Sequence, residues 1–420
     1  MQAAHLIFSL MLQASLVYIL LRISQKHPFQ RYFFLFLSIK IIAACSLGLV
    51  YKFFYASGDT WNYFLSAKYA ISQKDYLPWL IGAEMLLPYF SLLQDSAIFF
   101  VKIISLLIWP GGGNYWTTAS LLSILSFGAI WLLIRKIETF WPNKAGAVLV
   151  AFLAVPSFLF WTSGIIKETV AIILIVVMTI SFINIARDKP KIYDFIVITI
   201  LGYILFVLKY YYAAIFLPVA IAYVLAYRIR TIPAWSVIVI FFSLALISLS
   251  VFHYNLGLSR VTHIIYENYE ALQAKSKSTS LIYLVNFDGT LPSYLINSPL
   301  ALFQGLFAPL IKIPEHWLEL IATVENWIFF VLLIISLSKL NLKKILDPEP
   351  FALIILIITG ATILTFSTPN IGTLIRYRVV YQPFFSFLIL NHFFFPTRFF
   401  VPENSNSSTK YFDQNKEKSQ

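Results

Sequence analysis

The stretch TVAIILIVVMTISFINIA, residues 169–186, carries no charged side chain and is long enough to cross a lipid bilayer as one helix. Lipid offers no hydrogen-bond partner to an open backbone N–H or C=O, so such a segment satisfies its backbone internally as an α-helix. The whole chain shares this character, since 59% of its 420 residues are hydrophobic and 12% are charged. Soluble domains are roughly half apolar and one quarter charged. The sequence therefore predicts an all-α polytopic membrane protein.

Similar apolar runs recur along the chain and predict about eleven transmembrane helices. They lie near residues 4–21, 33–55, 116–134, 145–161, 169–186, 193–211, 213–227, 234–252, 316–338, 350–366 and 379–396. The first run lacks the basic flank and cleavage site of a secretory signal, so we expect it to be retained. Residues 1–400 then form one integral membrane domain, and the polar tail 401–420 is expected to be disordered and cytoplasmic.

The basic residues in short loops predict which side of the membrane each loop faces. Loops rich in Lys and Arg stay in the cytoplasm, and five of them alternate with less basic connections, at residues 22–31, 134–144, 186–194, 227–233 and 338–344. The amino terminus is then outside and the carboxyl terminus inside. We expect a multi-pass protein of a cell membrane, most simply a bacterial inner membrane, with its functional site on the extracytoplasmic side.

Two segments on the predicted outer side, 56–115 and 253–315, are too long to be simple turns. Loops longer than about 15 residues usually serve as lids or binding surfaces. The first holds two apolar stretches, 79–93 and 97–109, broken by proline or charge, which favour interfacial or re-entrant helices. If one of them spans the membrane instead, the topology changes.

The stretch YASGDTWNYF, residues 55–64, places the carboxylate of Asp59 at the outer end of a span. Next to Tyr63 and the other aromatic residues of this stretch, an acid at a lipid boundary can keep the partly dry setting that suits a general base. The alternative is an ordinary helix N-cap that accepts backbone hydrogen bonds.

Further polar groups on the predicted outer side are candidates for binding phosphate or sugar. Lys167 and Glu168 open a span after the turn at residues 163–164, although headgroup snorkelling also explains such a pair. Arg376 and Arg378 lie on the predicted outer side, although basic residues usually favour the cytoplasmic side. A guanidinium can donate two parallel hydrogen bonds to a phosphate. Positions two apart on a helix diverge by roughly 200°, so we expect only one of these arginines to face a site.

The stretch KYYYAA, residues 209–214, offers Lys209 and Tyr211 as a sugar-stacking wall or as part of an interfacial aromatic belt. The two histidines His253 and His263 have no third ligand at a zinc-like spacing, so no metal or other cofactor is indicated. The net charge of +12 is spread between apolar spans, and therefore no nucleic-acid surface is predicted.

Three motifs together resemble the integral-membrane glycosyltransferases of the GT-C class. They are the acid after an early span, the Trp-x-Ser-Gly-x-x-Lys-Glu hairpin of residues 161–168, and the closing RYRVVYQPFFSFLIL of residues 376–390. The likeness is greatest to the mannosyltransferase-like branch that uses dolichyl- or undecaprenyl-phosphate sugars. The general arrangement of spans and loops is similar over most of the chain. At the level of individual residues, the resemblance rests on these three motifs alone.

The resemblance implies a hexosyltransferase that moves a sugar from a polyprenyl-phosphate donor to a lipid- or glycan-linked acceptor, surrounded by membrane lipids. It implies that Asp59 is the base and that Arg376 lies near the donor phosphate, with Lys167 and Glu168 also at the site. The chain departs from the family pattern in two places. Thr60 stands where a second acid often follows the first, and an extra amino-terminal span precedes Asp59.

Two other classes remain open from the residues. A polysaccharide polymerase or ligase also pairs outer loops with arginines. A transporter or lipid flippase places ionisable residues at mid-membrane, and Lys40 lies within a span. A transferase needs only one base, because phosphate leaves as a stable anion, whereas glycosidases need two opposed carboxylates.

Overall fold

The chain folds into a bundle of helices in a computed structural model that describes residues 2–25, 27–55, 59–73, 77, 80, 96–251, 257–310, 314, 317–339 and 341–391. Within these residues there is no β-strand, only an isolated bridge between Leu281 and Asn370. The tail 401–420 and, apart from Leu80, the predicted interfacial segment 79–93 lie outside the described residues. The all-α fold class is confirmed for the rest.

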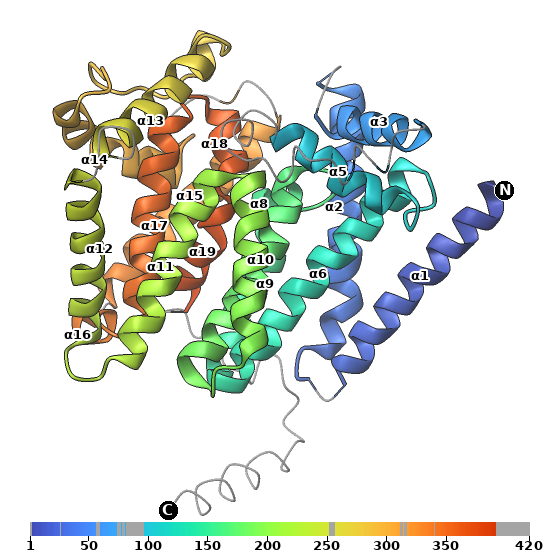
Figure 1. Ribbon diagram of the computed structural model, residues 1–420, viewed down its shortest axis with the longest axis horizontal. Coiled ribbons are helices and arrows are strands. Elements are labelled where there is room, and N and C mark those ends of the chain that lie inside the picture. The colour runs from blue at the N-terminus through green and yellow to red at the C-terminus, as the bar shows by residue number, and fades with distance from the viewer. Residues whose placement is uncertain are drawn as a thin grey trace, which may run out of the picture.

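The helices follow one another with short connections through most of the bundle (Figure 1). The first half of the chain forms α1 (Gln2–Ile23), η1 (Gln30–Tyr32), α2 (Phe33–Phe53), α3 (Asp59–Ser72), α5 (Ser96–Ile108), α6 (Tyr115–Phe140), η3 (Pro142–Lys144), α7 (Ala145–Leu153), α8 (Pro156–Trp161), α9 (Lys167–Arg187) and α10 (Ile192–Leu208). The second half forms α11 (Tyr210–Arg228), α12 (Ala234–Val251), α13 (Leu258–Gln273), η4 (Ser278–Ser280), α14 (Leu291–Phe307), α15 (Trp317–Ser338), α16 (Leu342–Ile345), α17 (Pro348–Ser367), α18 (Ile371–Tyr377), η5 (Arg378–Val380) and α19 (Gln382–Leu390).

Seven of the described helices, α1, α2, α6, α9, α11, α15 and α17, are long and apolar enough to cross a membrane. The protein is therefore a multi-pass helical membrane protein. The other predicted spans correspond to shorter pieces: α7 with α8, α10, α12, and α18 with α19. The predicted interfacial stretch 97–109 is α5, whose 13 residues are fewer than a single crossing needs.

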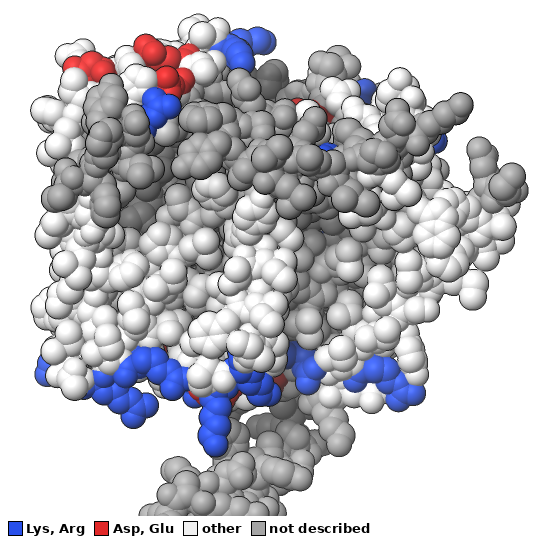
Figure 2. Space-filling view, viewed as in Figure 1, with Lys and Arg blue, Asp and Glu red and all other residues white. Residues whose placement is uncertain are grey.

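The two ends of the bundle differ in charge. Figure 2 shows Lys and Arg along one edge, acidic side chains mixed with basic ones at the opposite corner over α13, and a broad uncharged band between them. The loops after α6, α9, α11 and α15 lie at the first end, which we call the basic end; their residues are 141–144, 188–191, 229–233 and 341–347. The helices α3, α5, α13, α14 and α18 gather at the opposite end (Figure 1).

Helices α6 and α9 form the centre of the bundle. Their most apolar windows are 78% and 72% buried, against 11% for α1, which leans along one edge (Figure 1). Helix α9 packs against α6, α10 and α11. Because apolar side chains cover α9 on nearly every side, its first turn is held rigidly at the end opposite the basic loops. That turn carries Lys167 and Glu168.

The helical structure is broken inside the bundle just before α9. Pro156 opens α8, the first-turn position that tolerates a missing N–H, and α8 ends at Trp161. Gly164 then adopts a φ of +78°, which only glycine takes without strain. A Cβ at this position would also lie 3.2 Å from a methyl group of Leu47. This turn connects the end of α8 to the first residue of α9.

Lys40 of α2 closes the interrupted end of α8. Its side chain is fully buried, and its Nζ donates hydrogen bonds to the carbonyl oxygen of Thr162 at 2.7 Å and to the Thr162 hydroxyl at 2.6 Å. A cation is favourable at the carbonyl end of a helix. Irregular backbone is stable at membrane depth only when protein groups satisfy it. Lys40 thus acts here as a cap for a broken helix.

The last part of the chain is also built from short helices. α17 ends at Ser367, and the Asn370 side chain caps α18 by accepting a hydrogen bond from the Thr373 N–H at 3.0 Å. The same Asn370 amide donates to the hydroxyls of Ser276 at 3.1 Å and Ser280 at 3.0 Å. These bonds join α18 to the segment that follows α13. As a result, Arg376 is fixed at the end opposite the basic loops.

We predict that Lys40→Met destabilises the turn before α9. The Thr162 carbonyl and hydroxyl lose a charged donor, a loss of about 1.5–3 kcal/mol. The apparent melting temperature in detergent should fall, and amide hydrogen exchange at residues 163–166 should speed up. Lys52→Met, on the exposed end of the same helix, is the matched control. Equal behaviour of the two variants would contradict a capping role.

Candidate functional site

A single arginine joins two carboxylates from distant parts of the chain. Arg376 of α18 donates from Nε to Glu168 Oε1 at 2.7 Å and from Nη1 to Asp59 Oδ2 at 2.9 Å. Asp59 and Arg376 are 317 positions apart in the sequence. The second terminal nitrogen, Nη2, has no hydrogen-bond partner among the described residues. The two carboxylates therefore hold the guanidinium through Nε and Nη1, and Nη2 can still donate a hydrogen bond to another group.

Glu168 is the buried anchor of this group. Its side chain is 0% exposed, and its Oε1 accepts a second charged hydrogen bond from Lys209 Nζ at 2.6 Å. Its position in the first turn of α9 is also favourable for a negative charge. The other oxygen, Oε2, is buried without a hydrogen-bond partner in the described part of the chain. One carboxylate thus fixes two cations.

Asp59 differs from Glu168 in its access to solvent. It is the first residue of α3, and its side chain is 50% exposed. Its described ion pair is the one with Arg376. An exposed pair of this kind contributes little to stability, about 0–1 kcal/mol, so another anion can take the place of Asp59 on Arg376 at small cost. Of the two carboxylates, Asp59 is the one an incoming molecule can reach.

Aromatic rings surround the two cations. Lys209 Nζ lies 3.8 Å from the ring centre of Tyr377, and Tyr211 packs against Tyr377 with ring centres 5.3 Å apart. The guanidinium of Arg376 lies 5.9 Å from the ring of Trp161, and its Nη1 is 3.4 Å from the hydroxyl of Tyr51. Cations over aromatic faces are stabilised electrostatically. The rings therefore help to hold positive charge in a largely dry setting.

Lys167 lies at the edge of the group, beside α3 and α5. Its Nζ donates to the Ser96 hydroxyl at 2.9 Å and lies 5.7 Å from the ring centre of Tyr63. Burial raises the pKa of the Tyr63 phenol above its ordinary value, and the nearby charge of Asp59 raises it further. Tyr63 is thus a neutral hydrogen-bonding group next to the carboxylate.

Arg376 remains positively charged despite its burial. A guanidinium keeps its proton in proteins, and the Glu168 carboxylate, which accepts a hydrogen bond from Nε, offsets the cost of burying it. The group is a permanent cation at any physiological pH. An anion bound there gains a charge-assisted hydrogen bond rather than a proton.

The structure separates the two arginines of the RYR motif. Arg378 is 3% exposed and points toward α15, where its Nη1 donates to Asn326 Oδ1 at 2.9 Å and its Nη2 donates to the carbonyl of Ala308. It belongs to a second buried polar cluster and does not join Arg376. Two positions along a helical turn send the side chains to different neighbours, so only Arg376 faces Asp59, and phosphate binding by Arg378 stays a prediction that its buried contacts do not favour.

The other predicted site residues come together around Arg376. They are Asp59, Tyr63, Lys167, Glu168, Lys209 and Tyr211. Glu168 and Lys209 form the buried backing of the group, so neither lies at its surface. Tyr51 and Tyr377 were not predicted. The repeated tyrosines flanking Lys52 and Arg376 were the available signal, but tyrosines are common at membrane interfaces.

Searches against protein-family models, curated protein sequences and solved structures find no match to this chain. The function must therefore be argued from the chain's own residues.

The two carboxylates should differ sharply in their contribution to stability. Glu168→Gln leaves Lys209 buried without its anion and leaves Arg376 with only the exposed Asp59; removing one partner of a buried ion pair typically costs about 3–5 kcal/mol. Asp59→Asn, the matched acid-to-amide change, should cost about 0–1 kcal/mol. Thermal unfolding of both variants in the same detergent measures the difference. A larger fall in melting temperature for Asp59→Asn would contradict the assignment of Glu168 as the anchor.

Proposed function

We propose that this protein is a membrane glycosyltransferase of the GT-C type, which moves a hexose from a polyprenyl-phosphate donor to a lipid- or glycan-linked acceptor. The observation that carries the proposal is the bridge of Arg376 between an exposed acid, Asp59, and a buried one, Glu168. It brings a permanent cation for phosphate and an accessible base for a hydroxyl to the same place. The three motifs that resemble the GT-C class all contribute to it.

The positive-inside rule supports an extracytoplasmic site. The basic end of the bundle faces the cytoplasm under this rule, and Arg376 is at the other end (Figure 1). The proposed topology has eleven spans, with α7 and α8 forming one broken span and α18 and α19 contributing another. The donor then reaches the site from the outer leaflet, where its polyprenyl chain stays in lipid.

The donor phosphate binds Arg376 through its free Nη2 and through Nη1, which it takes over from Asp59. This exchange matters because a carboxylate tied to a guanidinium is a weak base. Arg376 stays in position during the exchange, since Glu168 still holds its Nε. Lys167 adds a second positive charge on the side of Tyr63. Binding of the donor thus releases Asp59 for the acceptor.

The transfer is a single displacement at the anomeric carbon. The acceptor oxygen attacks this carbon as Asp59 takes the hydroxyl proton, and the bond from carbon to the phosphate oxygen breaks. The bonding electrons leave with polyprenyl phosphate, whose charge Arg376 and Lys167 stabilise. The configuration at the anomeric carbon is inverted, because attack and departure occur on opposite faces. No second acid is required.

Asp59→Asn should lower the transfer rate by about 100- to 10,000-fold, the usual loss when a general base is removed. The measurement uses purified protein, a synthetic polyprenyl-phosphate sugar and an acceptor glycan, with product detected by mass spectrometry. Asp288→Asn, which removes an exposed acid on the segment before α14, is the matched control. Near-normal transfer by Asp59→Asn with unchanged folding would remove Asp59 as the base.

The length of the product separates this proposal from its nearest competitor. A transferase adds one sugar per acceptor, whereas a polysaccharide polymerase or ligase joins preformed repeat units. Incubation with a lipid-linked oligosaccharide of known length therefore decides between them. A ladder of products spaced by that length would replace the transferase assignment with the polymerase.

A further inference from the structure

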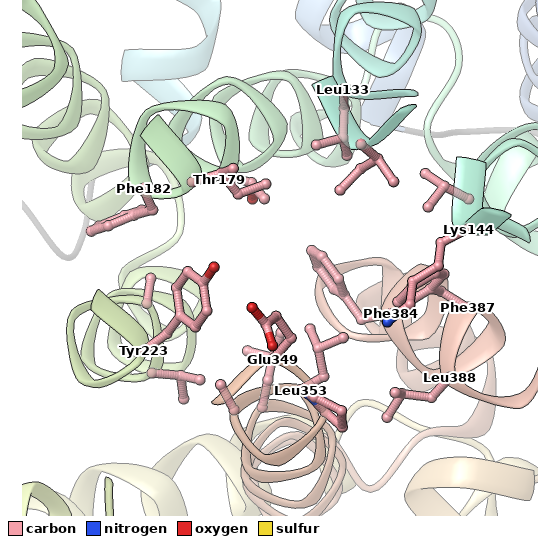
Figure 3. Close-up of a pocket in the computed structure, with 18 of the residues that line it drawn as sticks. Leu133, Lys144, Thr179, Phe182, Tyr223, Glu349, Leu353, Phe384, Phe387 and Leu388 are labelled. Atoms are coloured by element: carbon pink, nitrogen blue, oxygen red, sulfur yellow. The ribbon is translucent and has the colours of Figure 1, made fainter. Parts of the chain in front are cut away.

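A second cavity lies at the basic end of the bundle, away from Arg376. Its volume is about 140 Å³, and α6, α7, α9, α11, α17 and α19 enclose it. Figure 3 shows Leu133, Phe182, Tyr223, Leu353 and Phe384 around an open centre, with Lys144 and Glu349 also at its edge. Almost all the lining side chains are apolar. A cavity of this size and character stays free of water and accepts hydrocarbon.

Among the described residues, one cation at this cavity has no anion within ion-pair distance, although the carboxylates of Glu349 and Asp347 lie in its neighbourhood. Arg187 pairs with Glu349 and stacks on Trp141, with 4.0 Å from the guanidinium carbon to the ring centre. Lys144, in η3, is partly buried and makes no ion pair within the described part of the chain. The Tyr223 hydroxyl is buried beside Arg187 and Glu349, and in Figure 3 it points toward the open centre. An ammonium and a hydroxyl are thus available to a ligand.

The bilayer itself supplies a suitable ligand. Moving an acyl chain from lipid into an apolar cavity gains little from the hydrophobic effect, because lipid tails are as apolar as the cavity wall. The gain is in filling the void, which restores the dispersion contacts that the lining side chains lack. Any lipid chain provides this gain, so the headgroup decides which lipid stays. Next to an unpaired ammonium, an anionic headgroup is favoured.

We propose that this cavity binds one acyl chain of an anionic phospholipid from the leaflet at the basic end, with its phosphate on Lys144. The phosphate oxygens accept a charged hydrogen bond from the Lys144 ammonium, and the upper part of the chain passes Tyr223. The acyl chain then fills the space that α7 and α19 line together with α9, α11 and α17. The site is independent of the proposed transferase chemistry.

Native mass spectrometry of the full-length protein tests the headgroup. The protein is purified in a mild detergent and exposed to phosphatidylglycerol or phosphatidylcholine with identical acyl chains. Phosphatidylglycerol should be retained roughly tenfold more strongly, as expected for one charge-assisted hydrogen bond. Lys144→Gln should abolish this preference, whereas Lys189→Gln, an exposed lysine at the same end, should keep it. Equal retention of the two lipids, or equal effects of the two variants, would overturn the proposal.

A photoactivatable phosphatidylglycerol with a diazirine in its acyl chain tests the cavity. Labelled peptides should include residues 384–388 of α19 or 148–152 of α7, and excess unlabelled phosphatidylglycerol should compete. Ala220→Phe, which fills the cavity from α11, should remove this labelling, while Leu244→Phe on the exposed face of α12 should leave it. Labelling confined to exposed helix faces would overturn the proposal even if Ala220→Phe fails to fold.

Discussion

The buried carboxylate of Glu168 is the constraint on which the proposed site depends. Two cations approach the same oxygen, Arg376 from α18 and Lys209 from the junction of α10 and α11, and each would carry a large desolvation cost without it. Glu168 itself lies in the first turn of α9, where the helix dipole favours a negative charge. The position of the guanidinium is therefore set by the packing of α9, a feature of the whole bundle.

A second requirement is that broken helices must find hydrogen-bond partners within the protein. Lys40 satisfies the end of α8, and Glu325 of α15 satisfies its beginning by accepting from the Ser157 N–H at 2.8 Å. Gln382, at the start of α19, donates to the same Glu325 at 2.6 Å. Ionisable and amide side chains inside this bundle thus replace the water that lipid excludes. This accounts for buried charge without invoking a path for ions, which lessens the case for a transporter.

The sequence predicted features whose cause is local. Apolar runs identified the seven helices that are long and apolar enough to cross a membrane. Proline and glycine marked the turn before α9, and helical geometry required Arg376 and Arg378 to diverge. Helical geometry alone could not tell which arginine would face Asp59, because that choice depends on how α18 packs against the segment after α13; only the family resemblance pointed to Arg376. Nor could the sequence pair Lys40 with Thr162, since those residues are 122 positions apart and meet only after α2 and α8 pack together.

The two ion pairs of Arg376 differ in strength for a physical reason that bears on function. The contact with Glu168 is shielded from water, so salt and competing anions weaken it little. The contact with Asp59 is half exposed, so water and ions compete for both partners. The phosphodiester of a polyprenyl-phosphate sugar carries one negative charge, as Asp59 does, so it can replace the weaker partner at small cost and leave the stronger one intact. The Arg376 guanidinium can therefore be held rigidly by Glu168 and still bind an incoming anion. Two equally buried carboxylates would block that anion, and two equally exposed carboxylates would not hold the guanidinium in place.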